Sequence, residues 1–299
     1  MKKLLCILLA LLLCTPALAS GETIVTSFYP IYLFALNLLE GVDGVTLTSL
    51  AEPGAGCLHD YQLQTGDMKA LAKADAFLIN GAGMESYLEG VFEAFPALPL
   101  VDASQGVALL EDCSDGHDHE GHDHDHAVNA HIWLDAQNAI LMVNNLAEGL
   151  IAALPAQAVA ISANRDAYTA RLASLDAEIE TALANVPSKD IITFHEAFPY
   201  FAEAYGLNVA AVVNRDPDDA LSPRALAELC KLVKSLGAPP LFVEPQYEDM
   251  AAQTIARETG AALHSLDPIV TGPDQDVPLT WYEDVMRQNL AVLLEALDR

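Results

Sequence analysis

The sequence predicts an α/β protein with two lobes, each built on a mainly parallel sheet, bridged by one long rigid α-helix. Three observations predict this fold. Strand and helix patterns alternate from residue 23 to residue 104, the alternation restarts at residue 190, and the longest helical pattern of the chain, residues 156–185, lies between them. Alternating strands and helices are typical of a parallel sheet covered on both faces, as in Rossmann-like lobes.

The first lobe should hold four strands, followed by an irregular stretch. One strand is expected within each of residues 23–41, 45–54, 76–80 and 98–104, with helices between them. Residues 111–127 are acidic, rich in Gly and His and without periodicity, so we expect a mobile loop there. Order should return as a short extended piece, followed by a helix that starts near Asp135.

The central helical pattern sets the expected domain bounds. Apolar residues recur in it at three- and four-residue spacing, with Pro155 at its start and Pro187 just beyond its end. About thirty residues would span roughly 45 Å, which is too long for an ordinary crossover helix. We therefore expect a first lobe over residues 20–155, a linking helix over 156–186 and a second lobe over 187–299.

The second lobe repeats the alternation of strands and helices. Its clearest helix should begin with Ser222 as N-cap and Pro223 at the first helical position, and end at Gly237. Cys230 falls inside this amphipathic pattern, so we expect a buried thiol.

Residues 1–19 are typical of a secretory signal peptide. A short basic start, an apolar run and the Ala17–Ala19 cleavage pattern occur in order, so we expect an exported protein, periplasmic or associated with the cell surface. Cys14 raises the alternative of a lipid anchor, but Leu13 stands where that processing needs a small residue, and cleavage after Ala19 is favoured. No later stretch is long and apolar enough for a membrane span.

The charge argues against one class of partner. The formal net charge is −28, whereas nucleic-acid binding depends on Lys and Arg that neutralise phosphates. Acidity attracts cations, although it also serves solubility alone. We expect no nucleic-acid partner.

Four histidines lie outside the His-rich stretch, and three of them fall where a predicted element gives way to a loop. These are His59, His131 and His195, and Asp267 likewise ends a strand. Open α/β sheets bind ligands at such positions. Alone, each residue is a weak signal, and Asp267 before Pro268 could be a turn-forming aspartate. His264 should leave its strand on the opposite face from Asp267, so we interpret it as structural.

Residues 116–126, GHDHEGHDHDH, hold the other five histidines, His117, His119, His122, His124 and His126. Alternating His and Asp on a Gly-punctuated loop would offer shifting, weak and poorly selective metal sites. We expect an accessory loop that collects zinc near the main site. The alternatives are a solvated tether without a role, and a metal buffer in which this run is the principal site.

Several stretches together resemble the metal-binding solute-binding proteins of ABC transporters, and most closely their zinc-uptake (ZnuA-like) branch. The resemblance covers nearly all of the chain after residue 20 and rests on the order and spacing of five motifs: GAGCLHDYQLQTGDMKALAKADAFLINGAGMESYL, NAHIWLD, ITFHEAFPYFAEAYGL, LFVEPQ and ETGAALHSLDPI. It implies two lobes bridged by a long helix with a metal between them, capture and delivery of Zn²⁺ to a membrane permease, no enzymatic activity, and a monomer.

The resemblance also implies the metal ligands. They map onto His59, His131 and His195, with Asp267 or water as the fourth, because Leu58 beside the first histidine cannot ligate. Three imidazoles and one oxygen suit tetrahedral zinc, while Mn²⁺, the alternative metal, prefers more oxygen ligands. The family often has Pro where this chain has Ala130, which should change loop stiffness more than ligand identity.

Neighbouring residues suggest supporting contacts. Glu196 and Glu244 are candidates to hold the second ring nitrogen of a ligand histidine, with a helix cap or surface acid as the alternative. Cys57 lies two residues before His59, where it could join the coordination, although a disulfide with Cys113 is favoured.

Two other functions remain as alternatives. A zinc hydrolase could also use three histidines, but the H-x-H-x-D-H pattern fails from both His117 and His122, and no H-E-x-x-H occurs. A metal-dependent surface adhesin is compatible with transport, because some members of the family have been described in that role.

Overall fold

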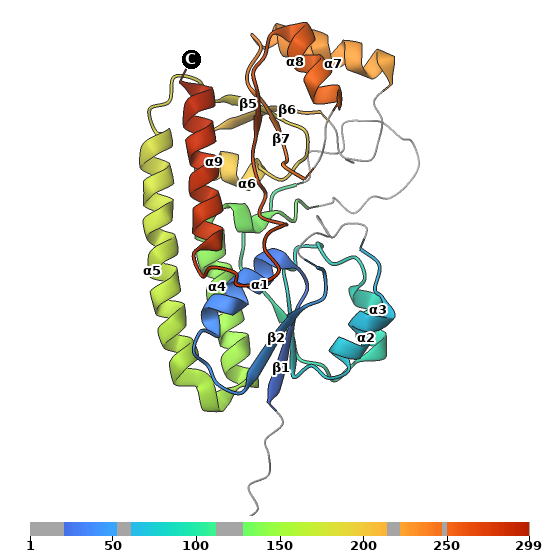
Figure 1. Ribbon diagram of the computed structural model, residues 1–299, viewed down its shortest axis with the longest axis vertical. Helices are drawn as coiled ribbons and strands as arrows, with labels where there is room; N and C mark the ends of the chain where they lie inside the picture. Colours follow the sequence, from blue (N-terminus) through green and yellow to red (C-terminus); the bar gives the residue numbers. More distant parts are fainter. Residues whose placement is uncertain (1–20, 53–60, 112–127, 214–221, 247–249, 299) are drawn as a thin grey trace, which may run out of the picture.

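The computed structural model of the protein describes residues 21–52, 61–111, 128–213, 222–246 and 250–298. These residues form two four-stranded sheets in which every strand pair is parallel, and helices pack around both. Figure 1 shows one sheet in each lobe, with a long helix beside both. The predicted fold class is confirmed.

The two sheets have the same strand order. The first is β2-β1-β3-β4 and the second is β6-β5-β7-β8, so in each the first strand of the lobe lies between the next two. The strands are β1 Glu22–Thr26, β2 Val45–Ser49, β3 Ala76–Ile79, β4 Leu100–Asp102, β5 Asp190–Thr193, β6 Asn208–Val212, β7 Leu241–Val243 and β8 Leu263–Ser265. Ligands of such sheets bind beyond the carboxyl ends of the central strands, where the order reverses.

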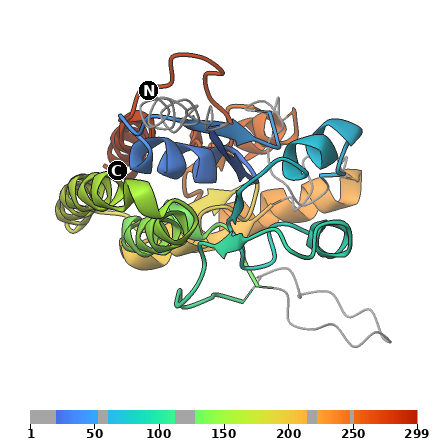
Figure 2. The same cartoon turned by 90° about the horizontal axis from the view of Figure 1, so that it is seen from below.

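Helices cover both faces of each sheet. In the first lobe α1 and α4 lie on one side and α2 and α3 on the other, in both ribbon views (Figures 1 and 2). In the second lobe α7 and α8 lie on the side away from α9 (Figure 1). The helices are α1 Tyr29–Leu38, α2 Thr65–Leu71, α3 Leu88–Ala94, α4 Ala136–Ala153, α5 Ala158–Leu183, α6 Pro199–Ala204, α7 Pro223–Ser235, α8 Met250–Thr259 and α9 Trp281–Leu297, with short 3₁₀ helices η2 Ile132–Leu134 and η3 Pro155–Gln157.

The long helix α5 joins the lobes. It packs against α1 and α4 of the first lobe and against the C-terminal helix α9. One hydrophobic core continues through all of them and includes Phe34 of α1, Leu172 of α5, Leu293 of α9 and Phe242 of β7. Because this core crosses between the lobes, α5 and α9 limit how far the two sheets can move apart. The residue bounds predicted for the two lobes stay a prediction, because α9, in the predicted second lobe, also contacts α1 of the first.

Local sequence signals explain several element ends. Ser222 caps α7 by accepting a hydrogen bond from the Ala225 N–H at 3.2 Å, as predicted. Asp135 caps α4 through the Gln137 N–H at 2.8 Å, as expected for a helix starting there. The predicted extended piece before Asp135 begins with a bridge between Val128 and Glu111, but its last three residues, 132–134, form the 3₁₀ helix η2 instead. Cys230 is a free thiol that is only partly buried.

None of the described helices is by itself long and apolar enough to cross a membrane. Helices α4 and α5 together reach that length and composition, but the chain bends by 117° between them. Seven residues of α4 and six of α5 are buried in the protein core.

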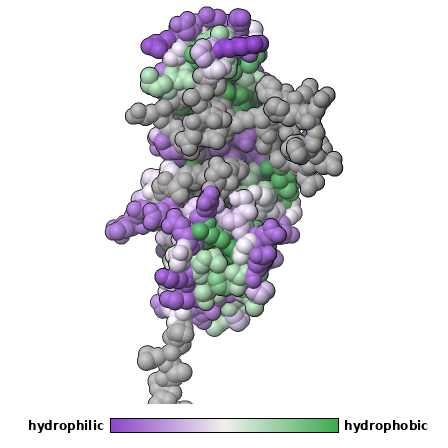
Figure 3. All heavy atoms as spheres, turned by 90° about the vertical axis from the view of Figure 1, so that its right-hand side faces the viewer, coloured by the Kyte–Doolittle hydropathy of each residue, from purple (hydrophilic) through white to green (hydrophobic). Residues whose placement is uncertain are grey.

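Polar and apolar areas alternate on one face of the surface (Figure 3). On the face shown in Figure 3, hydrophilic side chains occupy the upper end and surround a hydrophobic area of the lower, first lobe. The exposed large hydrophobic side chains of the described residues come from both lobes and the start of α5; they are Phe92, Leu109, Val159, Leu232, Leu236 and Met250. Scattered side chains of this kind are ordinary for a folded surface.

Candidate metal site

Two of the three predicted histidine ligands meet between the lobes. His131 precedes η2 in the first lobe, and His195 follows β5 by two residues in the second. Their ring centroids are 4.8 Å apart with the rings nearly perpendicular, at 84°. Both side chains are buried, with His131 1 % and His195 8 % exposed. The structure therefore brings one histidine from each lobe into direct contact.

The Nδ1 atom of each ring has an acceptor as its partner. Nδ1 of His131 lies 3.1 Å from Oδ1 of Asn129, and Nδ1 of His195 lies 2.5 Å from Oε1 of Glu244. An amide or carboxylate oxygen only accepts, so each Nδ1 carries a proton, and in the neutral ring Nε2 carries the lone pair. Metal-binding histidines are typically oriented in this way, with the second ring nitrogen held by a neighbouring oxygen.

The amide orientation of Asn129 is fixed by its other bonds. Its Oδ1 also accepts the backbone N–H of His131 at 2.9 Å, and its Nδ2 donates to the carbonyl of Glu196 at 2.7 Å. A flipped amide would place a donor against the His131 N–H and an acceptor against the Glu196 carbonyl. The tautomer of His131 therefore follows from three hydrogen bonds of one side chain.

The segment carrying His131 is held by packing as well. The indole N–H of Trp133 donates to the carbonyl of Pro268 at 2.8 Å, and the hydroxyl of Tyr282 donates to the carbonyl of Trp133 at 2.6 Å. The Trp133 ring also packs on His131, with centroids 5.2 Å apart. These bonds join η2 of the first lobe to the segment after β8 and to α9.

A strained turn after β3 supports the segment that carries His131 from within the first lobe. Gly81, Ala82 and Gly83 all have positive φ, at 77°, 52° and 81°. A Cβ on Gly81 would meet Oδ1 of Asp102 at 2.0 Å, so this position requires glycine. Asn80, at the start of the turn, donates from Nδ2 to the Ala130 carbonyl at 3.0 Å. The turn thus touches the residue that precedes His131.

A buried carboxyl group holds this turn. Oε1 of Glu85 accepts the N–H of Asn80 at 2.7 Å, and Oε2 accepts the N–H of Gly81 at 3.1 Å. Burial raises the pKa of Glu85 to about 7, although hydrogen bonds from the backbone favour the charged form. Sequence reasoning missed Glu85, Asn80 and Asn129; the Gly-Ala-Gly run was the signal for the turn.

Asp267 lies two residues beyond β8, at the same edge of the second sheet as Glu244. Its Oδ1 accepts the N–H of Ile269 at 2.7 Å, and Ile269 has a positive φ of 65°. Asn289 of α9 bonds both backbone groups of Asp267. Burial, and then the negative charge of Glu244, raise the pKa of the Asp267 carboxyl above its ordinary value. Asp267 therefore forms a turn, and its role as a ligand stays a prediction.

The remaining predicted site residues separate into two groups. His264 packs its ring against Phe242, with centroids 5.7 Å apart. His59, Leu58, Cys57, Cys113, His117, His119, His122, His124 and His126 lie outside the described residues. In the described part of the chain no group of three His, Cys, Asp or Glu side chains is placed to hold a metal ion.

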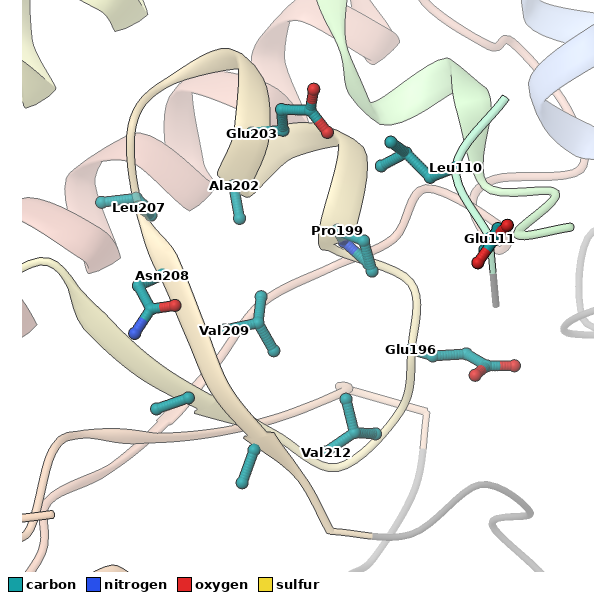
Figure 4. Close-up of a pocket in the computed structure, with 12 residues that line it drawn as sticks. Leu110, Glu111, Glu196, Pro199, Ala202, Glu203, Leu207, Asn208, Val209 and Val212 are labelled. Atoms are coloured by element: carbon teal, nitrogen blue, oxygen red, sulfur yellow. The ribbon is translucent and has the colours of Figure 1, made fainter. Parts of the chain in front are cut away.

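The two glutamates predicted as histidine partners differ. Glu244 is buried at 5 % exposure and holds His195, as predicted. Glu196 lines an open cavity of about 570 Å³, together with Glu111, Glu203 and residues of β6 (Figure 4). The Glu196 contact that bears on the site is its backbone carbonyl, which accepts from Asn129.

Comparison with known proteins identifies the family. Residues 24–296 match the family model described as "Zinc-uptake complex component A periplasmic". The chain belongs to this family. The description of the family names zinc uptake, which agrees with the resemblance seen in the sequence.

Individual relatives agree with the family assignment. The zinc-binding protein AdcA of Streptococcus pyogenes is 30% identical over 292 residues, covering 92% of this chain and 56% of AdcA. The high-affinity zinc uptake system protein ZnuA of Bacillus subtilis is 30% identical over 283 residues, covering 92% of this chain and 87% of ZnuA. The chain spans about half the length of the AdcA relatives it matches.

A solved structure confirms the fold. The solute-binding protein FpvC of Pseudomonas aeruginosa, in complex with Mn²⁺, superimposes with a TM-score of 0.77 and 28% sequence identity. The alignment covers 93% of this chain and 98% of FpvC.

Proposed function

We propose that the protein captures Zn²⁺ between its lobes and delivers it to the membrane permease of an ABC transporter. The observation that carries this proposal is the pair of buried histidines, His131 and His195, one from each lobe, with ring centroids 4.8 Å apart. Both Nδ1 atoms face oxygen acceptors, which directs both Nε2 lone pairs toward metal binding.

His59 supplies the third imidazole in this proposal, and Asp267 or a water molecule the fourth ligand. Three neutral imidazoles and one oxygen match tetrahedral zinc, with Zn–N distances of about 2.0–2.1 Å. The names of the relatives AdcA and ZnuA support zinc as the metal. Manganese is the second candidate, since FpvC binds Mn²⁺ and two carboxyl groups, the buried Glu244 and the half-buried Asp267, lie at the same edge.

The protein works outside the cytoplasm in this proposal, either in the periplasm or at the cell surface, and as a monomer. The predicted signal peptide and the periplasmic description of the family model support the location. The His-rich segment, residues 116–126, collects zinc for the site. Because α5 and α9 share one core with both lobes, loading and release follow from small shifts around the site rather than wide opening.

Zinc titration of the metal-free protein tests the proposal. One tight site is expected for the wild type, and it should be lost in the variant that combines His59→Ala, His131→Ala and His195→Ala. His264→Ala is the matched control, because that ring packs on Phe242 and should leave zinc binding unchanged. Tight binding that survives in the triple variant would contradict the site. Competition between Zn²⁺ and Mn²⁺ in the same assay distinguishes the two metals.

Deletion of residues 116–126 tests the accessory role of the His-rich segment. The tight site should remain, while the total number of bound zinc ions, or uptake at scarce zinc, should fall. Loss of the tight site in this deletion would instead make the His-rich segment the principal binding site.

A further inference from the structure

Asn129 bonds to both lobes at the place where the two histidines meet. It lies two residues before His131 and follows an isolated antiparallel bridge between Glu111 and Val128. Its side chain is buried, at 3 % exposure. Asn129 makes five hydrogen bonds. Its backbone N–H donates to the Leu110 carbonyl at 2.9 Å, and its own carbonyl accepts from the Tyr200 hydroxyl at 2.8 Å. In the side chain, Oδ1 accepts the His131 N–H at 2.9 Å and lies 3.1 Å from Nδ1 of the His131 ring, while Nδ2 donates to the Glu196 carbonyl at 2.7 Å.

The two ends of the Asn129 amide contact different lobes. The oxygen holds the backbone and ring of His131 in the first lobe. The nitrogen donates to the carbonyl of Glu196, the residue directly after His195 in the second lobe. The Asn129 amide therefore connects the backbone of Glu196, next to His195, with the ring of His131.

Tyr200 reinforces the same contact from the second lobe. Its hydroxyl donates to the carbonyl of Asn129 at 2.8 Å and accepts the N–H of Leu110 at 2.9 Å. The side chain is buried, at 4 % exposure, and belongs to α6. Leu110 and Asn129 are themselves bonded, so the tyrosine joins both chain segments of the first lobe.

We propose that the side chain of Asn129 is a positioning group that sets the separation of the two metal-binding histidines before zinc arrives. It acts through both lobes at once, and the hydroxyl of Tyr200 assists it. Neither residue touches the metal. This inference rests on the proposed function, because it assumes that His131 and His195 bind the ion.

The physical reason is preorganisation. Ligands held at the correct separation in the metal-free protein need not be ordered when the ion binds, so less of the binding free energy is lost. Loss of a group that orients a metal-binding histidine typically lowers metal affinity by about 10- to 100-fold. Here one amide orients His131 and also fixes the backbone next to His195.

Two substitutions separate the parts of this role. Asn129→Asp keeps an oxygen acceptor for His131 but replaces the Nδ2 donor with an oxygen that faces the Glu196 carbonyl. Tyr200→Phe keeps the ring and removes both hydroxyl bonds. Asn145→Ala is the matched control, since its amide bridges the Ala103 and Gln105 carbonyls within the first lobe.

The measurements are zinc affinity by competition with a chromogenic chelator, zinc release by stopped flow, and thermal stability of the metal-free protein. We expect Asn129→Asp to lower affinity and speed release by about tenfold or more, with a smaller change in the same direction for Tyr200→Phe. Asn145→Ala should lose comparable thermal stability and keep wild-type zinc binding.

Two results would overturn the proposal. One is a zinc affinity and release rate in Asn129→Asp equal to those of the wild type, which would mean that Asn129 acts only as an acceptor for His131. The other is an equal loss of zinc affinity in Asn145→Ala, which would make the effect one of stability. The His131→Ala/His195→Ala double variant distinguishes these from a failure of the proposed function, since tight binding in that variant would remove the site itself.

Discussion

The two lobes have the same strand order, yet they position their histidines differently. In the second lobe the buried carboxylate of Glu244, directly after β7, contacts His195 itself. In the first lobe the buried carboxyl of Glu85 holds the turn after β3, and that turn reaches the carbonyl of Ala130 beside His131. His131 has a neutral amide as its ring partner instead.

The different ring partners of His195 and His131 separate the effect of a charged partner from that of a neutral one. A carboxylate next to an imidazole raises the basicity of the ring, whereas an amide orients the ring without adding charge. Two carboxyl groups lie at the edge of the second sheet, the buried Glu244 and the half-buried Asp267, and they are placed to favour a cation. The first lobe contributes a rigid frame. The following changes test this contrast, from the largest expected effect to the smallest.

Glu85→Gln should change how stability depends on pH. The pKa of Glu85 is about 7 in the folded protein, against an ordinary value of 4.5, so the folded state binds this proton more tightly than the unfolded chain. Its contribution to stability is therefore full below about pH 4.5 and is lost as the pH rises through about 7, which amounts to about 3 kcal/mol. Gln cannot ionise and removes this dependence.

Urea unfolding of metal-free protein at pH 4 and pH 8 measures the effect. The difference in unfolding free energy between wild type and Glu85→Gln should change by about 3 kcal/mol between the two pH values. Glu89→Gln, an exposed position on α3, is the control and should leave the pH dependence unchanged. Parallel pH curves for wild type and Glu85→Gln would contradict a raised pKa of Glu85 in the folded protein.

Glu244→Ala should weaken zinc binding directly. It removes the partner of His195 Nδ1, and losses of this kind lower metal affinity by about 10- to 100-fold. Glu244→Gln keeps an acceptor without its charge, which gives His195 the kind of partner that His131 has, so a smaller loss is expected. Glu228→Ala on α7, with 60% of its side chain exposed, is the control. Equal affinity in wild type and Glu244→Ala would contradict the role of the carboxylate.

Ser222→Ala should destabilise the second lobe without affecting the metal. It removes the N-cap bond to Ala225 at the start of α7, which costs about 1 kcal/mol of unfolding free energy. Helix α7 lies on the far side of the second sheet from α9 (Figure 1), so zinc affinity should stay at the wild-type value. A fall in zinc affinity here would mean that general stability, and not the local contacts, sets metal binding.

The sequence predicted elements well where local signals were strong. The pattern over residues 156–185 became α5 at Ala158–Leu183, because prolines flank a long run of helical spacing. The short apolar run after His131 was predicted as extended and is a 3₁₀ helix, since three residues carry no periodicity. The shared strand order was not predicted, because it depends on pairing between residues far apart in the chain.

The site was predicted in part. His131, His195 and the Glu244 contact came from motif positions and their resemblance to a family, and the structure brings them together. Asn129 was visible only as a neighbour of His131, because its contact with Glu196 joins residues 67 positions apart. Asp267 shows the opposite case, where the turn suggested by its Pro neighbour is present and the ligand role remains to be tested.

A crystal structure of the zinc-loaded protein, with the metal located by anomalous scattering at the zinc edge, tests the central claim most directly. We expect one fully occupied ion between the lobes, within about 2.0–2.1 Å of Nε2 of both His131 and His195. A tightly bound ion located elsewhere, or coordinated through Nδ1 of either ring, would contradict the account.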